Sequence, residues 1–404
     1  MANTNLTIDM ITREALEIAH EKCNFLGTIN RDYDDSFAKV GAKQGSTLRI
    51  RNPNQFTRRT GSRVMDIQDT LDTSQTLTVA TQDGVDIRFN SAELSLSIDD
   101  FNKRYLEPAM AVLVSNIEAD VLVDVTKSVY NLAGTAGTVV GASGDISAIG
   151  AARAKLNQQL APQMKGSRFL QLDSVTMGSV TNGIKSLFQP GEVVANAFKE
   201  GLVGRSQMAD FYENERTWTM SNAADVAGTL DSYTVIEGDD DLTVTGFSAA
   251  PTAGMVFTID GVYDCHPETK QAYSHLKQFV VLTGSTTTDL NFSPTIRLTG
   301  ARKNVTASDG GTAAPSTTAA ITFVGSASTS YRQNLMYHKD AFTFVTADLP
   351  IMDDAHKCVR RNKDGLALRV WQASDIKNDE LLMRIDILYG WKATRPEWAC
   401  RITN

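Results

Sequence analysis

Residues 45–98 contain the feature that most restricts how this chain can fold. Between Leu77 and Ile98 apolar and polar residues alternate, which predicts extended strands. Between the first predicted strand, 47–51, and the next lies a polar stretch, 52–69, that has too few apolar side chains to pack against a core. A long two-stranded excursion is only marginally stable alone in water, so it needs another surface to lie on.

Charge is distributed unevenly along this excursion, because basic residues come first and acidic residues follow. The two segments can pair within one loop or between copies of the chain, and the alternative is a solvated polar loop. Only Phe56 interleaves with the arginines, which disfavours a nucleic-acid patch. The candidates for contacts between subunits are Arg49, Arg51, Arg58, Arg59, Arg63, Asp66 and Asp69.

The strongest helical pattern in the chain covers residues 107–132, where apolar residues form a nearly unbroken stripe. Pro108 is tolerated only in the first turn or at a kink, and Gly134 is placed to end the helix. A helix of this length extends for about 39 Å, which is unusual for a globular domain. The residues expected on its solvent side are Glu118, Asp124 and Lys127.

Residues 7–22 predict a short amphipathic helix, with apolar residues at helical spacing and charged residues on the remaining faces. Such a helix either packs on its own domain, which we favour, or forms an arm that docks on a neighbouring subunit.

A connector rich in glycine, alanine and serine follows the long helix at 134–150. Its glycines lack the strand and helix context of a phosphate-binding loop, so we interpret them as a hinge or linker. The candidate hinge residues are Gly134, Gly137, Gly141 and Gly144. Helix and strand patterns then alternate, which indicates an α+β domain. The clearest elements are helices at 146–159, 182–187 and 192–200 and a strand at 168–172.

The composition changes between 227 and 332, where threonine, serine, glycine and alanine dominate and turn signals separate short strands. This pattern predicts a small β-barrel inserted into the α+β domain. Its expected strands are 242–245, 255–259, 279–282, 295–298 and 321–324. The chain then closes with two strands, 382–389 and 398–402.

Motifs that carry chemistry are missing from the sequence: it has no nucleophile elbow, phosphate loop or metal-binding helix. The cysteines are scattered, and Cys265 beside His266 would need further ligands to hold a metal. Asp239, Asp240 and Asp241 can collect calcium, but an acidic turn is the favoured interpretation. We therefore expect no enzymatic activity, cofactor or metal.

The net charge of −8 and the pI of about 5.3 do not fit a protein that grips phosphate backbones. No stretch approaches the roughly 20 apolar residues of a membrane span, and the first residues lack the layout of a secretory signal. We expect a protein that is cytosolic when made and does not enter a membrane.

The C-terminal run 384–401, RIDILYGWKATRPEWACR, resembles the closing segment of the coat proteins of short-tailed Salmonella phages of the P-twenty-two type. A second run, 261–281, GVYDCHPETKQAYSHLKQFVV, is similar to the part of that family's insertion domain where a polar loop leads into a barrel strand. The order of the parts agrees over nearly the whole chain. The matching motif positions are Tyr389, Gly390, Arg395, Pro396 and Glu397.

The resemblance implies an HK-ninety-seven-type phage capsid fold of the α+β class with an inserted small β-barrel domain. The implied parts are an N-terminal arm at 1–44, an E-loop with flanking strands at 45–98, the spine helix of the P-domain at 99–133, the A-domain at 134–226 and 333–378, the barrel at 227–332 and the closing P-domain strands at 379–404.

By the same resemblance, the chain is a major capsid protein that self-assembles through pentamers and hexamers into an icosahedral shell. The expected partners are further copies of the chain, a scaffolding protein, a portal and double-stranded DNA enclosed without specific binding, while a decoration protein is left open. Assembly is expected in the host cytoplasm and the final location is the virion.

Two alternatives from other classes remain open at this point. An encapsulin-like compartment shares the fold but encloses enzymes, and the contents of purified particles distinguish it from a phage shell. A carbohydrate-binding protein or adhesin would account for the threonine-rich strands, and it would be a monomer or a trimer.

Overall fold

The computed structural model describes residues 8–31, 46–62, 65, 67–68, 72–90, 102–184, 204–351, 357–363, 365–375, 377 and 380–404. They form two compact units. The first unit comprises Met1–Arg51, Ser74–Val121 and Phe342–Thr394, and the second comprises Asn52–Thr73, Leu122–Ala341 and Arg395–Asn404. Both units combine helices with strands, which confirms the predicted α+β class. None of the helices in the described ranges combines the length and apolar character needed to cross a bilayer.

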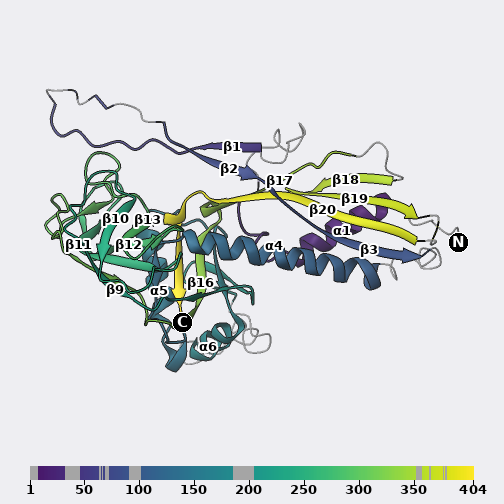
Figure 1. The fold of residues 1–404 in the computed structure, drawn as a ribbon, viewed down its shortest axis with the longest axis horizontal. Helices are drawn as coiled ribbons and strands as arrows, with labels where there is room; N and C mark the ends of the chain where they lie inside the picture. The colour runs from purple at the N-terminus through teal and green to yellow at the C-terminus, as the bar shows by residue number, and fades with distance from the viewer. Residues whose placement is uncertain are drawn as a thin grey trace. The chain divides into compact units, whose positions relative to one another are not determined.

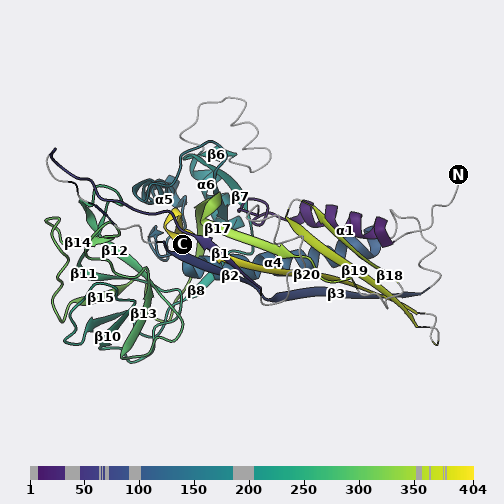
Figure 2. The same ribbon diagram turned by 90° about the horizontal axis from the view of Figure 1, so that it is seen from above.

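The first unit is built on an antiparallel sheet around the long strand β20 (Glu380–Ala393). Strands β3 (Thr81–Asn90), β17 (Phe342–Ala347) and β19 (Leu366–Asp375) all pair with β20, and β18 (Lys357–Lys363) pairs with β19. Figure 1 and Figure 2 show β18, β19, β20 and β3 side by side, with α1 and α4 against the sheet. The sheet therefore joins two distant parts of the sequence, 81–90 and 342–393.

Helix α1 (Ile8–Lys22) packs on the sheet of its own unit, against β18 and β19. Its apolar stripe is buried, with Ile11 and Ala15 fully covered. Asp9, in its first turn, accepts hydrogen bonds of 2.5–2.8 Å from the guanidinium of Arg361 on β18. These contacts confirm the interpretation that this helix belongs to its own domain.

The long helix α4 (Glu107–Ser128) follows a short π-helical turn, Asn102–Leu106, and Pro108 lies in its first turn as predicted. The expected solvent position of Glu118 is wrong, because its side chain is fully buried. One carboxylate oxygen of Glu118 accepts hydrogen bonds from the backbone N–H groups of Asn24 at 2.6 Å and Leu26 at 3.0 Å. The turn after α1 thus covers a face of α4 that looks polar in the sequence.

The predicted end of the long helix is also wrong, since α4 ends at Ser128 rather than at residue 132. Leu132 and Ala133 instead form β4 (Leu132–Ala133), which pairs in parallel with the last strand, β21 (Ala399–Thr403). The carbonyl of Val129 accepts two hydrogen bonds from the buried guanidinium of Arg401. Arg401 and β21 thus supply the hydrogen bonds that the backbone of residues 129–133 would make if the helix continued.

The root of the excursion is a two-stranded ribbon of β1 (Ser46–Arg51) and β2 (Ser74–Val79), paired from Ser46 with Val79 to Arg51 with Ser74. Apolar side chains on one face of this ribbon are buried in a cluster with residues of the first unit. The cluster comprises Leu48, Ile50, Leu77, Val79, Val345, Ala347, Leu349 and Leu388. Beyond this ribbon, the described residues of 52–73 form neither helix nor strand.

The second unit contains a mixed sheet in the order β4-β21-β16-β5-β7-β6, with β8 also paired to β16. Its remaining strands are β5 (Arg168–Leu172), β6 (Arg205–Ser206), β7 (Ala209–Glu213), β8 (Trp218–Ser221) and β16 (Ser330–His338). Helix α5 (Ser147–Gln158) buries Ile149, Ala152 and Leu156, as predicted.

Helix α6 (Ser174–Ile184) begins eight residues before the predicted start at 182. Asp173 explains the earlier start, because its carboxylate accepts hydrogen bonds from the backbone N–H and the hydroxyl of Thr176 and so caps the helix. The rest of the predicted helix 182–187 and the whole of the predicted helix 192–200 lie outside the described residues.

The inserted β-barrel is present and closed, because β12 pairs with both β13 and β11 at the ends of the series β12-β13-β10-β9-β15-β11. Its strands are β9 (Ala227–Leu230), β10 (Asp241–Thr245), β11 (Val256–Cys265), β12 (Ala272–Val281), β13 (Asp289–Ser293) and β15 (Ala320–Phe323), with β14 (Val305–Thr306) beside β11. Phe257 lies at the centre of its core, with ring centroids of Phe279, Phe292 and Phe323 at 5.6, 5.9 and 5.4 Å.

The predicted barrel strand at 295–298 is wrong. Ile296 is buried there, but its N–H bonds to the Asp239 carbonyl, and the N–H of Arg297 bonds to the side chain of Asn304. These hydrogen bonds hold a loop, because they do not form the regular pairing of a β-strand. Strand β13 was missed, although Leu290 and Phe292 alternate with polar residues in it.

Truncation of the central aromatic residue tests the barrel core. We expect Phe257→Ala to lower the free energy of unfolding by about 3–5 kcal/mol, because it leaves a cavity among three rings. Urea denaturation measures this loss. Phe56→Ala removes the same atoms from a side chain that is 58% exposed and should change stability little; equal losses for the two variants would contradict the assignment of the core.

Candidate assembly elements and a buried polar junction

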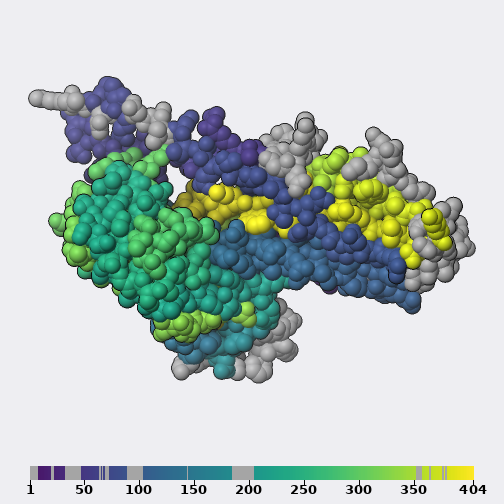
Figure 3. Space-filling model, in the orientation of Figure 1, coloured from purple at the N-terminus to yellow at the C-terminus, as the bar shows by residue number. Residues whose placement is uncertain are grey.

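The arm formed by the described residues between Asn52 and Thr73 carries apolar side chains that the chain itself leaves uncovered. Phe56 is 58% exposed, Met65 78% and Ile67 82%. Figure 3 shows the arm, in dark blue and purple, standing out beside the green surface of the barrel. Large apolar side chains gathered on an extended segment are typical of a surface that another molecule covers.

The arm is held by amide side chains. The side-chain amide of Gln68 donates to the Thr57 carbonyl and accepts from the Thr57 N–H, both at 2.7 Å. Asn54 donates to the carboxylate of Asp72 at 3.3 Å. At the base of the arm, where Asn52 bonds to Thr73, Arg302 of the barrel donates to the Thr73 hydroxyl at 3.1 Å. These bonds give the arm a defined course although it lacks an apolar core.

A single chain does not test the predicted charged contacts between subunits. Arg49 donates to the hydroxyl of Ser74 at 2.8 Å, and Arg51, Arg58 and Arg59 are exposed. Within the described part of the chain, no ion pair joins Arg49, Arg51 or Arg58 to an acid. Arg63, Asp66 and Asp69 lie outside the described residues. Pairing between copies of the arm therefore stays a prediction.

The four candidate hinge glycines all have positive φ angles, between 82° and 89°. A Cβ at Gly134 would lie 2.8 Å from the Thr403 carbonyl oxygen, and one at Gly141 would lie 2.5 Å from the backbone nitrogen of Val180. Gly137 and Gly144 have more room around them. Glycine at 134 and 141 is thus required for close backbone approach, and the hinge role of the segment stays a prediction.

The first half of the closing motif lies on β20, where strand β2 crosses it. The hydroxyl of Tyr389 donates to the carboxylate of Asp83 on β3 at 2.5 Å, and burial followed by this acid raises the pKa of the phenol far above its usual range. A Cβ at Gly390 would collide with the carbonyl oxygen of Thr78 on β2. Only glycine allows the two strands to come this close.

The second half of the motif forms a 3-10 turn, Pro396–Trp398, that leads into β21. The guanidinium of Arg395 lies 4.1 Å from the ring centroid of Trp398. The indole N–H of Trp398 donates to the carbonyl of Gln159 at the end of α5. The side chain of Asn131 donates to the Glu397 and Ala399 carbonyls at 3.2 Å each, and burial raises the pKa of the Glu397 carboxyl.

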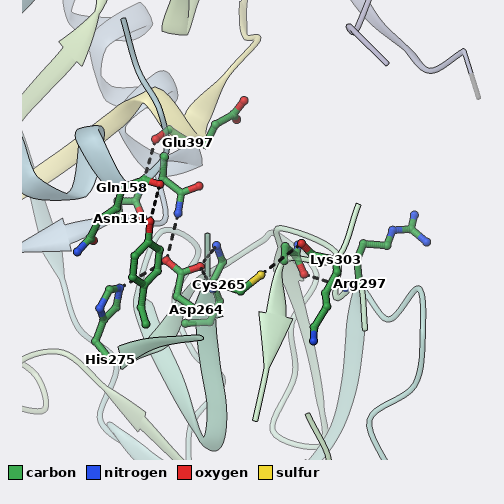
Figure 4. Close-up of polar contacts among 12 residues, drawn as sticks. Asn131, Gln158, Asp264, Cys265, His275, Arg297, Lys303 and Glu397 are labelled. Atoms are coloured by element: carbon green, nitrogen blue, oxygen red, sulfur yellow. Dashed lines mark hydrogen bonds and ion pairs between the residues drawn. The ribbon is translucent and has the colours of Figure 1, made fainter. Parts of the chain in front are cut away.

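Next to this turn, a buried carboxylate of the barrel faces the helical part of the same unit (Figure 4). Asp264 on β11 is 2% exposed and accepts a hydrogen bond from Lys277 on β12 at 2.8 Å. The side chain of Gln159 donates to the other carboxylate oxygen at 3.1 Å, and His275 lies 3.5 Å from it. Burial alone would raise the pKa of Asp264, but Lys277 and His275 outweigh it and hold this pKa well below its usual range.

The sequence did not single out Asp264 or Lys277, because one aspartate and one lysine in alternating strands look like ordinary surface residues. It singled out the neighbouring pair Cys265 and His266, whose atoms have other partners. The Cys265 thiol donates to the Lys303 carbonyl, and the His266 imidazole accepts backbone N–H groups of its own turn. In the described ranges, no three histidine, cysteine or acidic side chains gather as a metal site would require.

The cysteines that are buried have no feature of a nucleophile. All four cysteines are free thiols, and burial raises the pKa of the Cys400 thiol to about 12. Asp239, at the acidic turn, accepts the backbone N–H of Ile236 at 2.8 Å and so shapes its own loop.

Comparison with known proteins finds a family match for part of the chain. Residues 214–401 match the family model described as "P22 coat protein - gene protein 5", the family that the closing motif resembles. This range covers the barrel and most of the closing strands. No curated protein matches the chain.

Solved structures with similar folds have low sequence identity to this chain. Mycobacterium phage Che8 gives a TM-score of 0.47 at 10% identity, covering 94% of this chain and 90% of that one. The capsid of cyanophage P-SCSP1u gives 0.43 at 10% identity, covering 90% and 84%. The virus-like particle from Pyrococcus furiosus gives 0.41 at 7% identity, covering 98% of each chain.

The close strand crossing at Gly390 can be tested by adding one methyl group. We expect Gly390→Ala to lower the free energy of unfolding by about 1–3 kcal/mol, since backbone atoms must move apart. Gly150→Ala is the matched control, because that glycine lies in α5 with open space around it and alanine favours a helix by about 1 kcal/mol. A neutral Gly390→Ala variant in thermal unfolding would contradict the crossing.

The depressed pKa of Asp264 predicts how stability depends on pH. An aspartate in an unfolded chain binds a proton near pH 3.9, whereas the folded protein holds this carboxylate ionised to lower pH. The stabilisation is therefore complete above about pH 4–5 and is lost as the pH falls further. Urea denaturation at stepped pH should show a steeper loss of stability below pH 4 for the wild type than for Asp264→Asn. Asp260→Asn, exposed on the same strand, should keep the wild-type slope, and identical slopes for all three proteins would rule out the pairing.

Proposed function

Because residues 214–401 belong to the P22 coat protein family, we propose that this chain is a major capsid protein of a tailed phage. Copies of it assemble into the icosahedral head shell that encloses the genome. The family match carries this proposal, and the exposed apolar arm supplies its physical basis. The family is a structural one, so the function of the chain is to build a container.

Assembly covers the surface that one subunit leaves open. Phe56, Met65 and Ile67 lose contact with water when the arm lies across a neighbouring copy, and burying each of them is worth about 1.5–3 kcal/mol. The arginines next to Phe56 then meet acidic groups of the neighbour, which orients the contact. Repetition of such a heterologous contact around five- and sixfold axes closes a shell.

We assign the parts of the chain to an HK-ninety-seven-type capsid subunit. The E-loop corresponds to 45–98, and the spine helix of the P-domain corresponds to α4. The A-domain comprises the helices and mixed sheet of the second unit, the barrel is the inserted domain, and the closing strands complete the P-domain. The segment 1–44 is the N-terminal arm.

The proposed partners follow from the family. They are a scaffolding protein and a portal during assembly in the host cytoplasm, and double-stranded DNA inside the finished virion. The net charge of −8 suits a wall that encloses DNA without binding it specifically. An encapsulin-like compartment is the other container to consider, and nucleic acid rather than enzyme in purified particles distinguishes the phage shell.

The arm can be tested with a double charge reversal. We expect Arg58→Glu combined with Arg59→Glu to abolish shells or reduce their yield at least about tenfold, because like charges then face the acidic partner surface. Electron microscopy and light scattering measure the yield. The matched control, Arg58→Lys with Arg59→Lys, preserves the charge and should assemble. The proposed role of the arm is refuted if the reversed variant forms normal particles.

A further inference from the structure

The second unit has two separate apolar cores. One fills the barrel and includes Phe257, Phe279 and Phe292. The other lies between α5, α6 and the mixed sheet and includes Leu156 and Ile402. No residue is shared by the two clusters. The core between α5, α6 and the mixed sheet therefore does not continue into the barrel, although the barrel core extends to Met220 of β8.

The layer between the two cores is polar and buried. Its members come from β11 and β12 on the barrel side and from the ends of α4 and α5 and the closing segment on the other side. Five of its side chains are less than a tenth exposed: Asn131, Gln159, Asp264, Lys277 and Arg401. We call this layer the clasp.

Asp264 is the centre of the clasp, as Figure 4 shows. Its carboxylate is bonded to Lys277 of the barrel on one oxygen and to Gln159 of the helical part on the other. The ammonium of Lys277 also lies 5.1 Å from the ring centroid of Tyr130, just beyond α4. The carboxylate thus bonds directly to the end of α5, and its partner Lys277 contacts Tyr130 just beyond α4.

Further hydrogen bonds in the clasp also join the barrel to the rest of the second unit. The side-chain amide of Gln278 pairs with the N–H and the carbonyl of Leu132 at 2.9 and 3.1 Å, as a neighbouring strand would. The hydroxyl of Tyr273 donates to the Gln158 carbonyl at 3.1 Å. The guanidinium of Arg401 reaches the Gly254 carbonyl of the barrel at 2.7 Å while it holds Val129.

Buried polar layers differ physically from apolar interfaces. Desolvation offsets most of the attraction within a buried ion pair, so such a pair adds little net stability compared with apolar side chains of the same size. Its hydrogen bonds are satisfied in one geometry only, and removal of one partner leaves a buried charge alone. A clasp of this kind therefore determines the orientation of the barrel more than it increases the free energy of unfolding.

We propose that Asp264 is the positioning residue of this clasp, which docks the barrel in one orientation and can open while both apolar cores stay folded. The clasp makes the barrel a module whose placement can change without unfolding. The inference concerns the subunit alone, so it stands or falls independently of the proposed shell.

Hydrogen–deuterium exchange on the full unassembled chain tests the proposal. Three segments are compared: 130–133 in the clasp, 256–259 in the barrel core and 168–172 in the sheet of the other core. In Asp264→Asn, which keeps the shape but removes the charge, we expect exchange at 130–133 to rise at least about tenfold. The other two segments should stay within about twofold of the wild type.

Two controls separate orientation from stability. Asp260→Asn removes a charge from the exposed face of the same strand and should leave all three segments unchanged. Asp264→Leu combined with Lys277→Met replaces the ion pair by apolar side chains. This double variant should recover the thermal stability lost in Asp264→Asn but keep the fast exchange at 130–133.

Three results would overturn the proposal. The first is unchanged exchange at 130–133 in Asp264→Asn. The second is a rise at 256–259 or 168–172 of the same size, which would mean that a core unfolds. The third is full recovery of protection at 130–133 in the double variant, which would show that Asp264 contributes stability and not position.

Discussion

The exposed apolar side chains of the arm are the feature on which the proposed assembly depends. The arm between Asn52 and Thr73 is held at its base by the bond from Arg302 of the barrel to the Thr73 hydroxyl. Beyond this base its described apolar side chains, Phe56, Met65 and Ile67, remain open to water. Burial against a second copy is the simplest way to gain the free energy that these side chains offer.

Each half of the closing motif has a defined task in its own unit. In the first unit, Gly390 allows β2 to cross β20, so the motif determines where the arm leaves the sheet. In the second unit, the turn at Pro396–Trp398 holds the ends of α4 and α5 through Asn131 and Gln159. The turn thus holds Gln159, whose side chain donates to Asp264 of the barrel. The closing motif therefore makes many structural contacts, although its few residues are a weak signal in the sequence.

Patterns of local origin could be predicted from the sequence: the amphipathic N-terminal helix, the start of α4 at Pro108, helix α5, the closed barrel and the family. Features that depend on distant partners could not. The end of α4 is set by Arg401, which lies 272 positions after its partner Val129, and Glu118 is buried because a turn at Asn24 supplies its hydrogen bonds. Asp264 gains its importance from Lys277 and Gln159, and spacing along the chain does not reveal that these three side chains meet.

The most direct measurement of the central claim is the oxidation rate of Met65, whose side chain is 78% exposed in the single chain. Hydroxyl-radical footprinting with mass spectrometry compares unassembled protein with purified particles. Burial of the arm against a neighbouring copy predicts that Met65 reacts at least about tenfold more slowly in particles. Equal rates in the two states would contradict the account, because the arm would then remain exposed after assembly.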